Sequence, residues 1–120
     1  MFTRRSGQRG ERRAERFLAR HGLRTVARNW HCRHGEIDLV MRDGGTLVFV
    51  EVRLRTPRGF ADGAASVDAF KQRRLVQAAA MYVADQAGWA DAPCRFDVVS
   101  IEGDTDEIGW IRDAFDADGW

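Results

Sequence analysis

The sequence lacks any run of about 18 apolar residues, the length that a membrane-spanning helix needs, which excludes a helical membrane protein. No apolar stretch follows the basic residues near Met1, so we expect no secretory signal. Cysteine is also scarce: Cys32 and Cys94 are isolated and have neither metal-site spacing nor the pattern of a disulfide framework. These absences predict a cytoplasmic protein with reduced thiols and no membrane partner.

Lysine is nearly missing, because Lys71 is the single lysine among nineteen basic residues. Compositional drift toward arginine is the simplest cause. The scarcity bears on function because one arginine, Arg53, stands where the chemistry of a lysine would be preferable.

The net charge of +1 conceals two blocks of opposite sign. Residues 1–35 contain ten arginines and two acids, whereas residues 102–120 contain seven acids and one arginine. A basic block favours an anionic partner, most commonly nucleic acid, although a solvated surface fits the charge alone equally well. The acidic block is expected to be a flexible or self-screening tail.

The length of 120 residues predicts a single domain over 1–120, with a core at about 7–102 and an acidic tail at 103–120. Apolar patterns and flanking turn residues predict helices at 8–21 and 67–87, strands at 24–30, 36–43, 46–54 and 95–101, and a loop at 55–65. Ser66 is the expected N-cap of the second helix, and residues 108–115 fit a strand or a helical turn. This order, α-β-β-β-α-β, predicts an α/β fold with a central mixed sheet flanked by helices, its third and fourth strands parallel.

The most informative feature is the hairpin around Gly44-Gly45. With these glycines at the centre of the turn, Asp38 falls opposite Glu51, and Glu36 falls opposite Arg53. Like charges that face each other across a ladder destabilise it, and two carboxylates about 4 Å apart repel by about 4 kcal/mol at an effective dielectric near 20. We therefore expect Asp38 and Glu51 to bind a divalent cation, Mg²⁺ or Mn²⁺.

A cation at this position suits a phosphoryl transfer site, because it can position a water and stabilise charge on the phosphate. The first predicted helix can add a further acid. Glu11 lies close to the apolar stripe of that helix, so it is the acid most able to point toward the body of the protein. The alternative is a first-turn carboxylate that the helix dipole favours.

Six motifs follow one another along the chain: Gly10-Glu11-Arg12-Arg13-Ala14, Arg28-Asn29-Trp30, Gly35-Glu36-Ile37-Asp38-Leu39, Val48-Phe49-Val50-Glu51-Val52-Arg53, Lys71-Gln72-Arg73-Arg74-Leu75 and Arg95-Phe96-Asp97-Val98-Val99. In these motifs, over about residues 7–102, the sequence resembles the YraN family of small bacterial proteins of uncertain function. The resemblance implies a restriction-endonuclease-like fold within the PD-(D/E)XK nuclease superfamily. It also implies that Asp38 and Glu51 are metal ligands, that Glu11 is an additional acid and that position 53 carries the catalytic basic residue. Related resolvases act as dimers, so the resemblance makes a homodimer an expectation here.

The chain departs from the family at one critical position, since Glu51-Val52-Arg53 replaces the usual Glu-x-Lys. A guanidinium stays protonated and cannot act as a base, but it can hold a phosphate or stabilise developing charge. Lys71 is a possible substitute, because it shares a helical face with Leu75 and can point toward the sheet. The alternative is an ordinary surface lysine.

Other polar features have simpler structural interpretations. The segment His31–His34 lacks a second pair of zinc ligands. Trp30 fits a core or hairpin anchor, although an exposed tryptophan among arginines can also stack on an unpaired base. Asp97 is expected to make a structural hydrogen bond or salt bridge, with a role in the site as the alternative. For Glu36 we expect an ion pair with Arg53, with metal binding as the alternative.

Together these observations predict a DNA-binding protein of the nuclease fold that hydrolyses phosphodiesters with Mg²⁺ or Mn²⁺, at branched or damaged structures. The expected DNA contacts are Arg28, Arg33, Arg55 and Lys71. The main alternative, which Arg53 favours, is a nuclease fold that binds DNA without turnover. Fold alone does not fix function, so a third interpretation stays open. In it, the chain is an assembly protein whose arginine-rich face binds an acidic protein.

Overall fold

A computed structural model describes residues 2–55, 68–103, 105 and 107–117. Its elements are α1 (Phe2–Arg20), β1 (Arg24–Cys32), β2 (Gly35–Asp43), β3 (Thr46–Arg55), α2 (Ala69–Asp85), the short 3₁₀ helix η1 (Ala87–Trp89), β4 (Cys94–Glu102) and β5 (Ile108–Phe115). The strands form one sheet in the order β1-β2-β3-β4-β5. β3 and β4 are parallel and the other neighbours are antiparallel, so the expected mixed sheet is confirmed. In the described part of the chain, no helix is long and apolar enough to cross a membrane.

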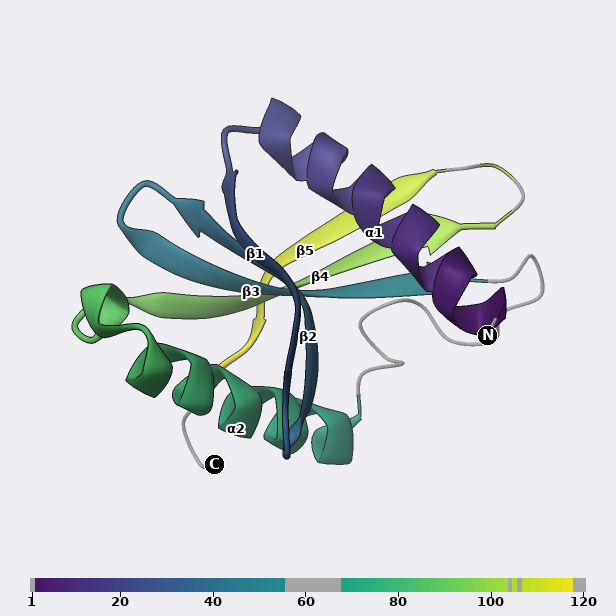
Figure 1. Cartoon of the computed structure of the whole chain (residues 1–120). Helices are drawn as coiled ribbons and strands as arrows, with labels where there is room; N and C mark the ends of the chain where they lie inside the picture. Colours follow the sequence, from purple (N-terminus) through teal and green to yellow (C-terminus); the bar gives the residue numbers. More distant parts are fainter. Residues whose placement is uncertain (1, 56–67, 104, 106, 118–120) are drawn as a thin grey trace.

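The two long helices lie on opposite faces of the sheet, and each face buries its own core (Figure 1). The core beneath α1 consists of Ala14, Leu18, Leu23, Leu39, Met41, Val48, Val50, Val99 and Ile101. The core beneath α2 consists of Ile37, Val40, Leu47, Phe49, Ala78, Ala79, Tyr82 and Phe96. Alternate residues of β3 enter different cores, as the period of two in a strand requires.

Several element boundaries differ from those expected. The first helix begins earlier, at Phe2, and the turn after its end contains Gly22 at φ +96°, a conformation that glycine adopts without strain. The N-cap of α2 is Asp68, whose side chain accepts a hydrogen bond from the Lys71 backbone N–H at 2.9 Å. Ser66, which we expected to cap this helix, lies outside the described residues, as does the loop over 56–65.

The segment 108–115, which fitted a strand or a helical turn, is an edge strand antiparallel to β4. Of the two expectations for the acidic block, the flexible tail is therefore wrong for this part, and the self-screening segment stays a prediction. Segment 108–115 is ordered as a strand because of its contacts with β4. Fully buried Asp97 lies at an irregularity in the β4–β5 ladder and accepts hydrogen bonds from the Asp113 backbone N–H (3.0 Å) and the Trp110 indole (2.9 Å). Arg95 completes the network with an ion pair to Asp97 at 3.0 Å, so the structural role expected for Asp97 is confirmed.

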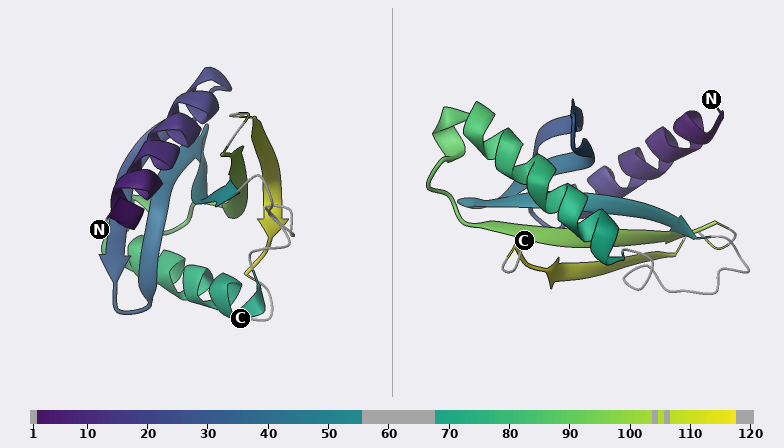
Figure 2. Two further views of the ribbon diagram at one scale, coloured as in Figure 1. Left: turned by 90° about the vertical axis from the view of Figure 1, so that its right-hand side faces the viewer. Right: turned by 90° about the horizontal axis from the view of Figure 1, so that it is seen from below.

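The β1–β2 hairpin curves out of the sheet toward the first turns of α2 (Figure 2). β2 pairs with β3 only from Asp43–Thr46 to Leu39–Val50, whereas its pairing with β1 continues to Cys32–Gly35. Trp30 on β1 makes an edge-to-face contact with Tyr82 of α2, with ring centroids 5.3 Å apart, which confirms its role as an anchor. The curve moves Ile37 into the core beneath α2, although Leu39 and Met41 pack beneath α1.

Replacing Asp97 tests the buried network. Asp97→Ala leaves the Trp110 and Asp113 N–H groups without their acceptor and Arg95 without its buried partner, so the free energy of unfolding should fall by about 3 kcal/mol. Urea denaturation measures the change. The control Asp91→Ala alters an exposed acid and should stay within about 0.5 kcal/mol of wild type. Equal stability of the two variants would contradict a structural role for Asp97.

Candidate metal centre

The site lies at the point where β2 and β3 separate. Beyond the Leu39–Val50 pair, the Asp38 carboxylate takes the place of a strand partner, since its Oδ2 accepts a hydrogen bond from the Val52 backbone N–H at 2.9 Å. The register expected from the Gly44-Gly45 turn is therefore correct over the pairs up to Leu39–Val50. Asp38 and Glu51 do not form a ladder pair, however, because the twist of the hairpin has already parted the strands.

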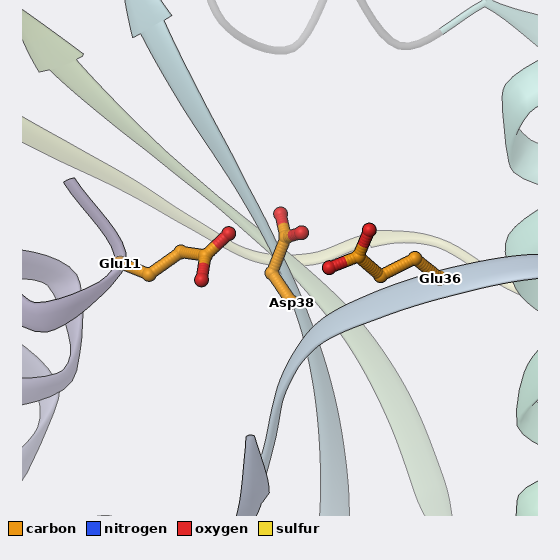
Figure 3. Close-up of side chains that lie close together, drawn as sticks. All are labelled: Glu11, Glu36 and Asp38. Carbon is orange, nitrogen blue, oxygen red and sulfur yellow. The ribbon is translucent and has the colours of Figure 1, made fainter. Parts of the chain in front are cut away.

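Three carboxylates converge at this opening. Glu11 comes from α1, and Glu36 and Asp38 come from β2; one potential ligand oxygen from each lies within 4.8 Å of the others. Figure 3 shows the three groups turned toward one another, with Asp38 between the two glutamates. The inward direction that helical periodicity predicted for Glu11 is confirmed.

Asn29 supports the two glutamates from β1. It has φ +50°, in the left-handed region that asparagine tolerates better than most residues. In the amide orientation that its neighbours require, its nitrogen donates to Glu11 Oε1 at 2.7 Å and to Glu36 Oε2 at 3.3 Å. Asn29 was not among the site residues that the sequence predicted. The available signal was an asparagine inside an expected strand, where this residue type is depleted.

The crowding of acids shifts their proton affinities. Burial and the nearby charge of Glu51 raise the pKa of Asp38 to about 8, although the Val52 hydrogen bond acts in the opposite direction. The pKa of Glu11 is also raised, first by burial and then by the charges of Glu36 and Glu51, against the effect of a hydrogen bond with Asp38. Negative charge is therefore costly here, and a bound cation would relieve that cost.

Glu51 is only 4% exposed and is held by two cations. The Lys71 ammonium lies 2.9 Å from Glu51 Oε2, and Arg53 Nη1 lies 3.5 Å from the same oxygen. Lys71 thus points into the site from the first turn of α2, and its interpretation as an ordinary surface lysine is wrong. The expected ion pair between Glu36 and Arg53 is not formed among the described residues, because Arg53 turns to Glu51.

Two cavities open on either side of these groups. One, of ≈ 270 Å³, lies toward α2 and is lined by Glu36, Phe70 and Arg74. The other, of ≈ 230 Å³, lies toward α1 and is lined by Glu11 and Arg53. Asp38, Glu51 and Lys71 line both cavities, so the two cavities adjoin at these residues. A substrate in either cavity would meet the same acids and the same ammonium.

The arginines expected to contact DNA are not gathered at this centre. Arg28 pairs with Glu15 at 2.7 Å, and Arg55 pairs with Glu102 at 3.1 Å. Arg33 is exposed at the β1–β2 turn. In the part of the chain that the structure describes, the segment His31–His34 contributes to no cluster of potential metal ligands. The three arginines remain predictions as DNA contacts.

The mixed sheet flanked by two helices, with acids converging beside a parted strand pair, defines an α/β protein with the layout of the nuclease-like fold. The chain belongs to the uncharacterised protein family UPF0102, whose model matches residues 10–101; this is the YraN family that the motifs indicated. It is 51% identical over 117 residues to a UPF0102 protein of Nitrosospira multiformis, covering 97% of each chain. A UPF0102 protein of Pseudomonas syringae pv. syringae is 47% identical over 115 residues, covering 93% of this chain and 94% of the relative.

The raised pKa of Asp38 predicts a pH-dependent effect on stability. Its folded-state value of about 8 exceeds the ordinary 3.8, so its contribution to stability is complete below about pH 4 and is lost as pH rises to about 8. Asp38→Asn keeps an acceptor for the Val52 N–H. Because the amide does not ionise, this variant does not lose that stability as pH rises. In EDTA, its Tm relative to wild type should rise as pH increases from 5 to 8, because only wild type loses stability over this range, by at most about 1.4 kcal/mol per pH unit.

The control Asp91→Asn alters an exposed acid away from the site and should lack the rise seen for Asp38→Asn. A Tm difference for Asp38→Asn that is constant from pH 5 to pH 8 would contradict the raised pKa.

Proposed function

We propose that this UPF0102 protein is a metal-dependent endonuclease that hydrolyses DNA phosphodiesters with Mg²⁺ or Mn²⁺, at branched or damaged structures. The observation that carries the proposal is the convergence, at one opening of the sheet, of three carboxylates with the Glu51–Lys71 ion pair. An acid cluster beside a fixed ammonium provides both a cation site and a positive group for a phosphate.

The residues present fit a hard divalent cation. All the donors are carboxylate oxygens, which Mg²⁺ and Mn²⁺ prefer, and the raised pKa values of Asp38 and Glu11 mark a site where positive charge is favourable. Glu51 remains the second predicted ligand beside Asp38. Among the described contacts, both of its ion pairs use Oε2, and Glu51 lies outside the group of three carboxylates whose ligand oxygens converge. Glu11 and Glu36 lie close enough to Asp38 to complete the coordination.

A cation held there would lower the pKa of a bound water and take up charge on the phosphate. The chain itself contributes orientation and positive charge. Glu51 fixes the Lys71 ammonium beside the acids, where it can stabilise the charge that develops on the phosphate oxygens. Arg53 is suited to hold a phosphate rather than to move a proton. In this mechanism Lys71 supplies the charge that the usual Glu-x-Lys motif places on β3.

The second candidate function is DNA binding without turnover. Arg53 favours it, because the lysine of the usual motif is missing. The ion pair between Lys71 and Glu51 favours the enzyme instead. It places a lysine ammonium beside Glu51, the carboxylate of the usual Glu-x-Lys motif. DNA binding alone would be salt-sensitive and independent of Mg²⁺ and Mn²⁺.

Removing the charge of Glu51 should abolish catalysis. Wild type should cleave branched or single-stranded DNA in Mg²⁺ or Mn²⁺, and Glu51→Gln should reduce the single-turnover rate by at least about 100-fold, because a ligand and the anchor of Lys71 are lost together. Glu107→Gln, which alters an exposed acid beyond the site, should cleave like wild type. An unchanged rate in Glu51→Gln would refute the assignment.

Substitution of the two positively charged side chains, Lys71 and Arg53, separates the candidate functions. Lys71→Gln should lower the cleavage rate by about 100-fold, and Arg53→Gln by a smaller factor of about 10, because the ammonium lies closer to Glu51. Mn²⁺ should still raise the Tm of both variants. The control Arg42→Gln changes an exposed arginine on β2 and should retain full activity.

Two results would overturn the role of Lys71. In one, Lys71→Gln cleaves as fast as wild type. In the other, wild type binds DNA without cleaving it and Arg53→Lys gains activity, which would show that the missing β3 lysine had inactivated the enzyme.

A further inference from the structure

Phe70 is a large apolar side chain that the fold leaves in solvent. It lies in the first turn of α2 and is 65% exposed, whereas the packed face of this helix is formed by Leu75, Ala78, Ala79 and Tyr82. Single exposed apolar residues are common and need no explanation by themselves. Phe70 differs because it lines the same cavity as Asp38, Glu51 and Lys71.

Arg74, one turn further along α2, forms another part of the same cavity wall. Its guanidinium carbon lies 5.7 Å from the centre of the Phe70 ring, and its Nε donates to the His34 carbonyl oxygen at 2.7 Å. Gly35, at φ +145°, packs so close that a β-carbon added there would lie 3.4 Å from Arg74 Nη2. Arg74 therefore joins the β1–β2 turn to α2 and stays beside the ring.

The cavity thus presents three kinds of surface, two from α2 and one from β2 and β3. Phe70 offers an aromatic ring, Lys71 and Arg74 offer positive charge, and the acids offer ligands for a cation. A nucleotide carries the matching groups in one unit, a flat apolar base and an anionic phosphate. In duplex DNA both faces of each base are covered by neighbouring bases, so only an unpaired base can stack on a protein side chain.

We propose that this cavity binds an unpaired nucleotide of the DNA substrate, with the base stacked on Phe70 and the phosphate directed toward Lys71 and the acid cluster. The proposal rests on the proposed function, and it names the substrate class of that site: DNA in which the nucleotide beside the cleaved bond is single-stranded. Phe70 is then a specificity-determining residue. Because every base has a stackable face, the preference is for strand state and tolerates any sequence.

Binding measurements test the role of Phe70 without requiring cleavage. Fluorescence anisotropy in Ca²⁺ compares a labelled oligothymidine with a blunt duplex. Phe70→Ala should weaken single-strand binding by about 5- to 150-fold, the equivalent of the roughly 1–3 kcal/mol of one base–aromatic stack, and should leave duplex binding unchanged. Phe70→Trp should retain the single-strand affinity. The matched control Ile111→Ala removes another exposed apolar residue, on β5, and should bind like wild type.

Three outcomes would overturn the inference: Phe70→Ala binds the single strand as tightly as wild type, it weakens single-strand and duplex binding by the same factor, or Phe70→Trp loses as much affinity as Phe70→Ala. A Tm equal to that of wild type confirms that each variant is folded. Wild type that binds single strands through Phe70 but cleaves no DNA would refute the nuclease proposal and support only the stacking of an unpaired base on Phe70. Normal cleavage with no effect of Phe70 on binding would refute this inference alone.

Discussion

The candidate site depends on one hydrogen bond, from the Val52 backbone N–H to the Asp38 carboxylate. β3 is an interior strand, and a buried N–H without an acceptor would cost about 1–3 kcal/mol. The Asp38 side chain meets that need where the strand partner has left, so the sheet can part without an orphaned donor. The same bond fixes the carboxylate in the gap. The space for a ligand and the orientation of its first contact therefore share one structural cause.

Around this bond the molecule holds more negative than positive charge. Four acids gather from α1, β2 and β3, and Lys71 and Arg53 both bind to Glu51. Asp38, with Glu11 on one side and Glu36 on the other, accepts a hydrogen bond from the Val52 backbone N–H, and Asn29 donates to the two glutamates. Such an arrangement lowers the stability of the metal-free protein. Strain of this kind is common at functional sites, and the packed cores beneath α1 and α2 carry the stability that offsets it.

What the sequence predicted correctly was mostly local. The Gly44-Gly45 turn determines the hairpin register as far as Leu39–Val50, and helical periodicity is sufficient to turn Glu11 inward. The separation of β2 from β3 beyond that pair was not predictable from the alternation of side chains along a strand. It arises where the Trp30–Tyr82 contact draws the β1–β2 hairpin toward α2. Helical periodicity also allowed Lys71 to point toward the sheet, but its pairing with Glu51 depends on how α2 packs against β3. The identity of Glu36 as a neighbour of Asp38, rather than of Arg53, follows from the same curvature.

The scarcity of lysine has a chemical consequence. Lys71 carries the only side-chain amine of the 120 residues, and that amine lies in an ion pair with a buried carboxylate. Amine-directed reagents therefore have a single side-chain target, and it lies inside the candidate site. Reductive methylation with ¹³C-labelled formaldehyde would place one side-chain NMR signal beside Glu51, separate from that of the chain terminus. Any ligand that draws Glu51 away from the ammonium would move this signal, so the composition of the chain provides a reporter of site occupancy without an introduced label.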